Sequence, residues 1–536
     1  MHSITLDGES LDISTVVTVA NAWYSAPRAR RGLRGQHPET VRVELAPGAV
    51  EGVRACREAV ERLVASGEIV YGITTGFGAF KDRLIAPDET AQLQKNLLMS
   101  HAVGVGPSLP ESAVRAMMLI RANTLAKGYS GVRLETLQAL LALLNHGVHP
   151  IVPAQGSVGA SGDLAPLAHM ALVLIGLGEA SFRGERMSGA QALQRNGLQP
   201  VALQAKEGVA LLNGTSLMTA IGCLAADRAW RLLQTADVAA ALSLEALNGT
   251  TRAYDARLHA LRPHPGQVAC AAHLLALLEG SELVRGKGSA NVQDAYTLRC
   301  VPQVHGAVRD ALAHVQNVLR IELNAATDNP LIFREADGDI ALSGGNFHGE
   351  PVALVMDYLG LALTDLGNMS ERRIARLLDA TSNGGVLPPF LTEHGGLHSG
   401  FMVVQYTAAA LASENKVLAH PASADSIPTS ANAEDHVSMG TTAARKAEQI
   451  AVHVETIVAL ELLCAAQGVD FRRRKQPSLR MGRGTAGTHK AIRDRVPFLA
   501  VDDVMYPHIE SVRRMVQEGG LSNPLDEDCQ RIADAD

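Results

Sequence analysis

The sequence predicts a mainly α protein, an elongated bundle of long helices with a smaller, mixed N-terminal part. Apolar residues recur at helical spacing along much of the 536-residue chain, whereas strand-like runs are short and few. With 47% hydrophobic and 19% charged residues, the composition is that of a soluble globular protein. We place a domain boundary after residue 225, which gives an N-terminal domain of residues 1–225 and a long-helix bundle domain of residues 226–536.

Stripes of apolar residues predict the individual helices. Two stripes in the N-terminal part, over residues 53–64 and 134–144, each end shortly before a glycine, which is a helix stop signal. Longer stripes follow over residues 304–323 and in the alanine- and leucine-rich run 444–466. Helices of this length pack side by side as a bundle.

Strands are expected in three short segments. These read HSITLDG at the start of the chain, TVRVELA near residue 43 and DIALSGG near residue 340. Each alternates apolar and polar residues over a few positions and is bounded by turn-forming residues. They predict a few hairpins attached to an α protein.

Charge and cysteine usage exclude several classes of protein. The formal net charge of −7 argues against a nucleic-acid partner, which needs a basic surface. Six cysteines are scattered without C-x-x-C spacing, as expected for reduced thiols in a cytoplasmic protein without a zinc site. The acidic N-terminus does not resemble a secretory signal. The apolar stretch 164–177 is too short for a membrane span and predicts a buried helix.

The most informative segment is QGSVGASGDLAP, residues 155–166, in which three glycines stand three residues apart. Phosphate-binding loops need either a Gly-Lys-Ser/Thr ending or G-x-G-x-x-G after a strand, and this segment has neither. A literal G-x-G-x-x-G occurs at residues 482–487, but it follows a basic segment without strand character. We interpret that second match as chance or a flexible loop.

The Ala160-Ser161-Gly162 segment has the residues for an internal cyclisation. If the Gly162 amide nitrogen reaches the Ala160 carbonyl carbon, the segment closes and loses water. Loss of the Ser161 hydroxyl then leaves an exocyclic methylidene, which is a strong electrophile. Glycine permits the close approach because it has no side chain, and Asp163 is placed to orient the amide or to take protons. Taken alone, Ala-Ser-Gly is a commonplace turn.

The surrounding sequence resembles that of a known enzyme family. Residues 156–179 are similar to the prosthetic-group signature of the aromatic amino-acid ammonia-lyases and aminomutases, which form 4-methylideneimidazol-5-one from Ala-Ser-Gly. The similarity runs from YGITTGFGAF at Tyr71 to TSANAEDHVSMGTTAARKA ending at Ala447. Among members of the family, the chain most resembles the histidine ammonia-lyases. This implies elimination of ammonia from L-histidine to give trans-urocanate, with no external cofactor or metal, by a homotetramer whose active sites combine residues of several subunits.

The resemblance also implies two catalytic tyrosines. Tyr71 lies in a glycine-rich loop and matches the family's catalytic base, whereas a tyrosine flanked by glycines is otherwise most often a packed loop aromatic. A phenol with an ordinary pKa of about 10 must be shifted down by positive charge or hydrogen bonds to act near neutrality. Tyr296 would support proton transfer or the developing charge.

Further residues match substrate-binding positions of the family. Gln293, Tyr296 and Arg299 stand three apart, which would align them on one face of a helix, and Arg299 is a natural bidentate partner for the substrate carboxylate. The resemblance assigns the prosthetic group or substrate amine to Asn213, the carboxylate to Asn329 and the substrate ring to Phe347. The plain alternatives are a helix cap, a turn residue and a core aromatic.

Two positions bear on which amino acid is the substrate. His101 follows a serine, as in the histidine enzymes, and Glu434 stands where those enzymes have a glutamate, which suits a basic ring. Two residues differ from the usual pattern of the histidine enzymes. Ala433 stands where those enzymes usually have a glutamine, and Thr74 is more like the residue of the tyrosine-specific members. Tyrosine ammonia-lyase or tyrosine 2,3-aminomutase therefore stays open as an alternative.

Two remote alternatives belong to other classes. A non-enzymatic helical scaffold is one. The other is a metal-dependent hydrolase with the candidate ligands His420, Asp425, Glu434, Asp435 and His436. No His-Glu-x-x-His motif supports this alternative.

Overall fold

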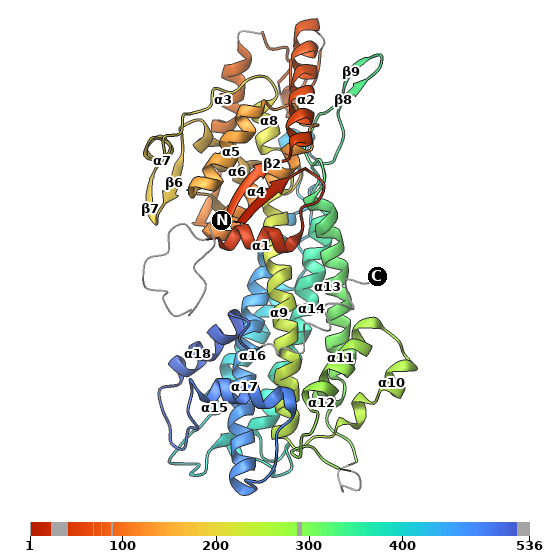
Figure 1. The fold of residues 1–536 in the computed structure, drawn as a ribbon, viewed down its shortest axis with the longest axis vertical. Coiled ribbons are helices and arrows are strands. Elements are labelled where there is room, and N and C mark those ends of the chain that lie inside the picture. The colour runs from red at the N-terminus through yellow and green to blue at the C-terminus, as the bar shows by residue number, and fades with distance from the viewer. Residues whose placement is uncertain are drawn as a thin grey trace. The chain divides into compact units, whose positions relative to one another are not determined.

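The computed structural model describes residues 2–22, 41–67, 69–76, 78–86, 89–286 and 292–521, and it confirms a mainly α protein (Figure 1). The chain forms two compact units. Unit 1 contains residues 1–227, 316–357 and 421–445, and unit 2 contains residues 228–315, 358–420 and 446–536. The units interleave along the chain because two later segments pack with the N-terminal part. The boundary after residue 225 stays a prediction.

The first eight helices belong to unit 1. The predicted stripes at residues 53–64 and 134–144 lie inside α2 and α5, and both helices end at a glycine in the left-handed conformation, with φ of 74° and 69°. Within the unit, α4 contacts α1 and α5, and α6 contacts α3 and α8. The bounds are α1 Ile13–Asn21, α2 Pro47–Ser66, α3 Thr90–His101, α4 Glu111–Ala126, α5 Leu134–His146, α6 Leu164–Leu174, α7 Gly189–Arg195 and α8 Glu207–Leu212.

Four small sheets are formed by the described residues, all in unit 1. The three predicted segments are strands β1, β2 and β9, but β1 and β2 pair in parallel, so the expected hairpin is correct only for β8 and β9. Strands β3 to β8 were not predicted, and β3 to β7 have only three or four residues, which are too few to show alternation. The bounds are β1 His2–Leu6, β2 Val41–Leu45, β3 Val105–Ser108, β4 Val148–Pro150, β5 Pro153–Gln155, β6 Glu179–Phe182, β7 Glu185–Ser188, β8 Leu331–Glu335 and β9 Gly338–Leu342.

A small hydrophobic core fixes the segment that carries Tyr71. The buried side chains of Val60 and Leu63 on α2 pack in one cluster with Ile73 and with Ile332 of β8. Ile73 is only 1% exposed. Its burial therefore anchors the chain two residues beyond Tyr71.

The remaining helices include the long ones. The predicted helices at residues 304–323 and 444–466 lie inside α13 and α16. Four single-turn 3₁₀ helices also occur among the described residues, at Gly78–Phe80 (η2), Thr251–Tyr254 (η4), Pro389–Leu391 (η5) and Ser430–Asn432 (η6). The bounds are α9 Ser216–Ala246, α10 Ala256–Ala260, α11 Pro265–Leu277, α12 Tyr296–Arg299, α13 Val301–Leu323, α14 Glu350–Leu378, α15 Met402–Leu418, α16 Gly440–Lys475, α17 Arg483–Arg493 and α18 Met505–Gln517.

Among the described residues, one helix is long and apolar enough to span a membrane, and that helix is α16. The mean hydropathy of its most apolar window is 1.6, and 78% of that window is buried inside the protein. A buried core helix has the same properties. The predicted buried helix at residues 164–177 corresponds to α6, most of whose side chains are inaccessible.

Candidate active site

The Ala160-Ser161-Gly162 turn follows β5 and leads into α6. Gly162 has a φ of 71°, in the left-handed region that favours glycine. A Cβ atom at Gly162 would lie 2.1 Å from the carbonyl oxygen of Gly214, with which Gly162 forms a parallel β-bridge. Two backbone segments therefore meet here at a distance that only glycine allows.

Ser161 is held by three hydrogen bonds in this turn. Its carbonyl oxygen accepts from Asn213 Nδ2 at 2.9 Å and from the backbone nitrogen of Gly214 at 3.3 Å. Its hydroxyl donates to Glu434 Oε1 at 2.7 Å. The other carboxylate oxygen of Glu434 accepts from the Thr429 hydroxyl at 2.8 Å, which fixes the orientation of the carboxylate. The structure thus brings together Ser161, Asn213 and Glu434.

Asp163 anchors the turn to the start of two helices. It precedes α6, and its Oδ2 accepts from the backbone nitrogens of Leu217 and Met218 in the first turn of α9, each at 2.9 Å. Its Oδ1 accepts from the hydroxyls of Ser157 and Thr441. Burial raises the pKa of the Asp163 carboxyl, and these donors oppose that effect. Because four donors surround the carboxylate, we assign Asp163 an anchoring role.

His101 is the last residue of α3 and interacts electrostatically with Glu434. Burial lowers the pKa of its imidazole, and the nearby carboxylate of Glu434 partly opposes this. The Ser100 hydroxyl lies 3.1 Å from His101 Nδ1. Burial therefore favours the neutral form of the ring, which can donate or accept a hydrogen bond.

Tyr71 lies in a half-buried position, and its loop contacts the loop that carries Glu434. The phenol oxygen accepts a hydrogen bond from the backbone nitrogen of Gly78 at 3.2 Å. Gly78 begins η2, which contacts η6, and a Cβ at Gly78 would lie 3.0 Å from Ser430 Oγ. The predicted base and the predicted specificity residue thus lie on neighbouring loops of unit 1.

Asn329 and Phe347 flank the same part of unit 1. Asn329 is 6% exposed. Its Nδ2 donates a hydrogen bond to Ser343 Oγ at 3.0 Å, and its Oδ1 accepts one from the backbone nitrogen of Gly344 at 2.6 Å. Phe347 is half-buried. Two residues beyond it, the backbone nitrogen of Gly349 donates to the Gly159 oxygen at 3.2 Å, which ties this segment to the turn.

Gln293, Tyr296 and Arg299 belong to unit 2. The Arg299 guanidinium lies over the Tyr296 ring, with its carbon 4.4 Å from the ring centroid. The Nε of Arg299 is buried and has no partner among the described residues. The predicted alignment of all three on one helical face is wrong for Gln293, because α12 begins only at Tyr296.

The residues named for a metal-dependent hydrolase do not cluster. Within the described ranges, the one group of histidine, cysteine and acidic side chains close enough to hold a metal is Asp237, Cys270 and His305. Asp237 there is already bound to the Arg309 guanidinium at 2.6 Å. None of the proposed hydrolase residues belongs to this group.

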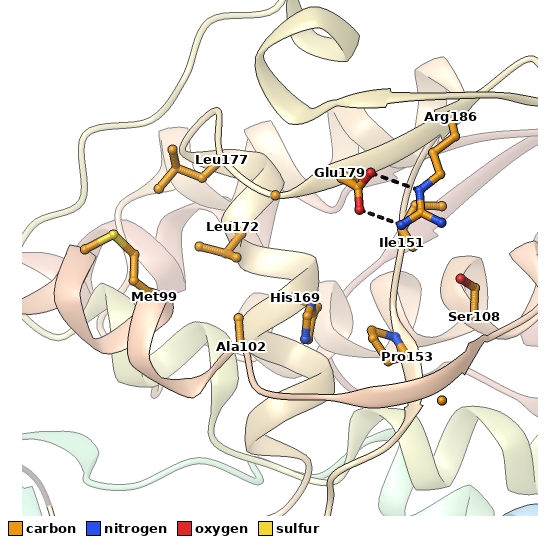
Figure 2. Close-up of a pocket in the computed structure, with 12 residues that line it drawn as sticks. Met99, Ala102, Ser108, Ile151, Pro153, His169, Leu172, Leu177, Glu179 and Arg186 are labelled. Atoms are coloured by element: carbon orange, nitrogen blue, oxygen red, sulfur yellow. Dashed lines mark hydrogen bonds and ion pairs between the residues drawn. The ribbon is translucent and has the colours of Figure 1, made fainter.

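A separate cavity of about 380 Å³ adjoins the strand that precedes the turn (Figure 2). Its wall includes Met99 of α3, Pro153 of β5 and His169 of α6, with the Glu179–Arg186 ion pair at one end. The Nε2 of His169 accepts a hydrogen bond from a backbone nitrogen. No predicted site residue lines this cavity.

Several supporting residues were not identified from the sequence. Gly214 directly follows Asn213 in the segment LLNGTS. A glycine beside a predicted site residue was a signal in the sequence that could have identified it. Thr429 and Thr441 carry hydroxyls that orient Glu434 and Asp163, and isolated threonines give no signal of this kind.

Comparison with known proteins gives a consistent result. Residues 33–494 match the family model described as aromatic amino acid lyase. Histidine ammonia-lyases of Chloroflexus aurantiacus and Alkaliphilus oremlandii are 58% and 52% identical, each over 97% of this chain and 98% of the relative. The crystal structure of histidine ammonia-lyase from Trypanosoma cruzi is 40% identical, with a TM-score of 0.86 over 97% of this chain and 94% of that one. Tyrosine aminomutase from Streptomyces globisporus is 38% identical, with a TM-score of 0.88 over 97% of both chains. The chain belongs to the family of aromatic amino acid lyases.

Proposed function

We propose that the protein is a cytoplasmic histidine ammonia-lyase, which converts L-histidine to trans-urocanate and ammonia. The observation that carries the proposal is the 2.7 Å hydrogen bond between Ser161 and Glu434, a carboxylate that also interacts electrostatically with His101. Relatives of this name that are more than half identical over nearly the full chain support the same substrate.

The prosthetic group of this enzyme would be the methylideneimidazolone formed from the turn. The Gly162 nitrogen bonds to the Ala160 carbonyl carbon, and the carbonyl oxygen leaves as water with the amide protons of Gly162 and Ser161. A second water molecule forms from the Ser161 hydroxyl and the Ser161 α-proton. The tight approach at Gly162 and the hydroxyl of Ser161 fit this chemistry. The ring supplies the electrophile that activates the substrate for loss of ammonia.

Donors to the Ser161 carbonyl oxygen would polarise this turn. Asn213 Nδ2 and the Gly214 nitrogen both donate to that oxygen. Preorganised donors in a buried site stabilise negative charge more than donors in water do. In our proposal these two groups make the segment more electrophilic.

Tyr71 would act as the base that removes the β-proton of the substrate. The hydrogen bond from the Gly78 nitrogen to the phenol oxygen supports this role, because it holds the phenol oxygen in a defined position. Tyr296 would assist proton transfer. We assign Arg299 and Asn329 to binding of the substrate carboxylate, and Gln293 and Phe347 to other contacts with the substrate. We propose a homotetramer in which several subunits contribute to each active site, without metal.

Glu434 and His101 would recognise the imidazole ring of histidine. A carboxylate held by Thr429 can accept a hydrogen bond from a ring N–H, and a neutral imidazole can donate or accept one. At the departure Thr74, the hydroxyl accepts a hydrogen bond from the Val70 nitrogen of its own loop at 2.9 Å. Ala433 is exposed in the turn before Glu434.

The alternative is tyrosine ammonia-lyase or tyrosine 2,3-aminomutase, favoured by the likeness to the Streptomyces globisporus aminomutase. The deciding experiment offers L-histidine, L-tyrosine and L-phenylalanine separately to the purified protein, with and without chelator. The proposal expects urocanate as the main product and activity that survives chelation. Formation of a β-amino acid would instead identify an aminomutase.

A further inference from the structure

Arg121 is a fully buried arginine beside the turn that the proposed chemistry does not use. It lies on α4, is 0% exposed, and donates from Nη2 to the Ala210 carbonyl oxygen on α8. Its Nε and Nη1 atoms have no hydrogen-bond partner within the part of the chain that the structure describes. Burying unpaired polar groups on a cation is costly, so such a residue calls for an explanation.

The Arg121 guanidinium packs directly against the backbone of Gly214. A Cβ atom at Gly214 would lie 2.6 Å from Arg121 Nη1 and 2.6 Å from Thr327 Oγ1. No side chain at Gly214 fits that space. Arg121 and Thr327 therefore form a wall behind this glycine.

Gly214 in turn clamps the residues on both sides of Gly162. Its nitrogen donates to the Ser161 carbonyl oxygen at 3.3 Å, and its own carbonyl oxygen accepts from the Asp163 nitrogen at 2.7 Å. These two bonds bend the chain around Gly162, the residue whose nitrogen must approach Ala160. The position of Gly214 thus controls the curvature of the turn.

The charge of Arg121 also interacts with this region. Asp163 and Asp328 both favour its charged form, while burial lowers its pKa to about 10, so the guanidinium is protonated at neutral pH. Asp328 has a second cationic partner in Lys206, at 3.0 Å and equally buried. Arg121 is therefore a buried positive charge that interacts electrostatically with the anchoring carboxylate of Asp163.

We propose that Arg121 is a positioning residue for ring closure in the Ala160-Ser161-Gly162 turn, acting through Gly214, which it holds in the place that clamps Ser161 and Asp163. This inference rests on the proposed function, because it concerns formation of that enzyme's prosthetic group. Arg121 does not touch the substrate in this account. Its contribution is made before the first turnover.

Arg115 is a matched control for Arg121. It lies on the same helix and is 3% exposed, but its Nε donates to the Val19 oxygen at 2.9 Å and its Nη1 to the Leu144 oxygen at 3.2 Å. These two acceptors lie on α1 and α5. Substitution of Arg115 therefore reports the cost of removing a buried arginine from α4 without disturbing the turn.

The test follows maturation by intact mass. Wild type, Arg121→Met, Arg121→Lys and Arg115→Met are made by cell-free synthesis, and the fraction of folded chain that has lost about 36 Da, two waters, is measured over time. We expect wild type and Arg115→Met to mature at similar rates, and Arg121→Met at least about tenfold more slowly, with Arg121→Lys in between. Thermal unfolding reports the folded fraction of each protein.

Each outcome has a distinct meaning. A folded Arg121→Met protein that matures as fast as Arg115→Met would overturn the inference. If Arg121→Met does not fold, Arg121→Lys decides, and maturation at the wild-type rate overturns the inference as well. A wild-type protein that never loses the two waters refutes the proposed function instead of the role of Arg121.

Discussion

Ser161 and Glu434 lie 273 residues apart in the chain, yet the serine hydroxyl donates to the glutamate at 2.7 Å. The residue proposed to form the electrophile is thus in contact with the residue proposed to choose the substrate. The same Ser161 hydroxyl is the group that must leave as water when the proposed prosthetic group forms.

Ser161→Ala removes the leaving hydroxyl and should abolish the loss of about 36 Da together with nearly all turnover. The fold should persist, since the hydrogen bonds from Asn213 Nδ2 and the Gly214 nitrogen to the Ser161 carbonyl oxygen do not need the Ser161 side chain. Intact mass and circular dichroism test both points. An active wild-type preparation with the full unmodified mass would refute this mechanism.

Gly162→Ala should be far more damaging than Gly67→Ala, although the two glycines have nearly the same φ, 71° and 74°. Nothing lies within 4 Å of a Cβ at Gly67, so that change costs only backbone strain of about 1 to 2 kcal/mol. At Gly162 the new Cβ meets the Gly214 oxygen, and we expect a loss of at least about 3 kcal/mol or an unmatured turn. Denaturant unfolding and intact mass compare the two variants, and equal effects would show that the close approach is unimportant.

Tyr71→Phe should leave maturation intact but lower kcat by about 10² to 10⁴, the usual contribution of a positioned general base. The variant keeps the ring and loses only the oxygen that accepts from the Gly78 nitrogen. Steady-state kinetics on fully matured protein provide the measurement. If turnover stays within a few-fold of wild type, Tyr296 becomes the next candidate for the base.

His101 should make stability depend on pH. Burial lowers the pKa of its imidazole, so the unfolded state, with a pKa of about 6.5, binds the proton more tightly. The stability from His101 is therefore fully present above pH 6.5 or so and is lost as the pH falls through the lowered pKa. Unfolding of wild type and His101→Asn at pH 8 and pH 5 should show wild type losing stability relative to the variant at low pH. A constant difference would contradict this.

Much of the fold was predictable because its signals are local. Apolar stripes and terminal glycines act within one or two helical turns. For this reason, α2 and α5 and their C-terminal ends could be predicted. Strands β3 to β7 are too short for a pattern, and the parallel pairing of β1 with β2 joins segments whose order in space no local signal encodes.

The candidate site depended on a different kind of information. No periodicity relates Ser161 to Glu434, so their proximity was accessible only through resemblance to a family. Arg121 illustrates the remaining gap, because an arginine within a helix normally predicts a solvated surface, and its burial against Gly214 depends on tertiary packing.

Glu434→Gln tests recognition of the substrate ring. It replaces a carboxylate by a neutral amide of the same shape and should weaken a charge-assisted contact by about 1.5 to 3 kcal/mol. We expect kcat/KM for L-histidine to fall by about ten- to a hundredfold, with a smaller effect on L-tyrosine. Thr429→Val, which removes only the hydroxyl that orients the carboxylate, should show a weaker effect of the same sign. A uniform loss on both substrates would mean that Glu434 serves the turn and not the ring.

The most direct test of the account is the substrate preference of the wild-type protein. Purified enzyme is given L-histidine, L-tyrosine and L-phenylalanine in separate reactions, and urocanate, coumarate and cinnamate are followed by their ultraviolet absorbance. We expect urocanate to form far faster than either other product. Faster formation of coumarate would contradict it and would show that Thr74 and Ala433 indicate the substrate better than His101 and Glu434.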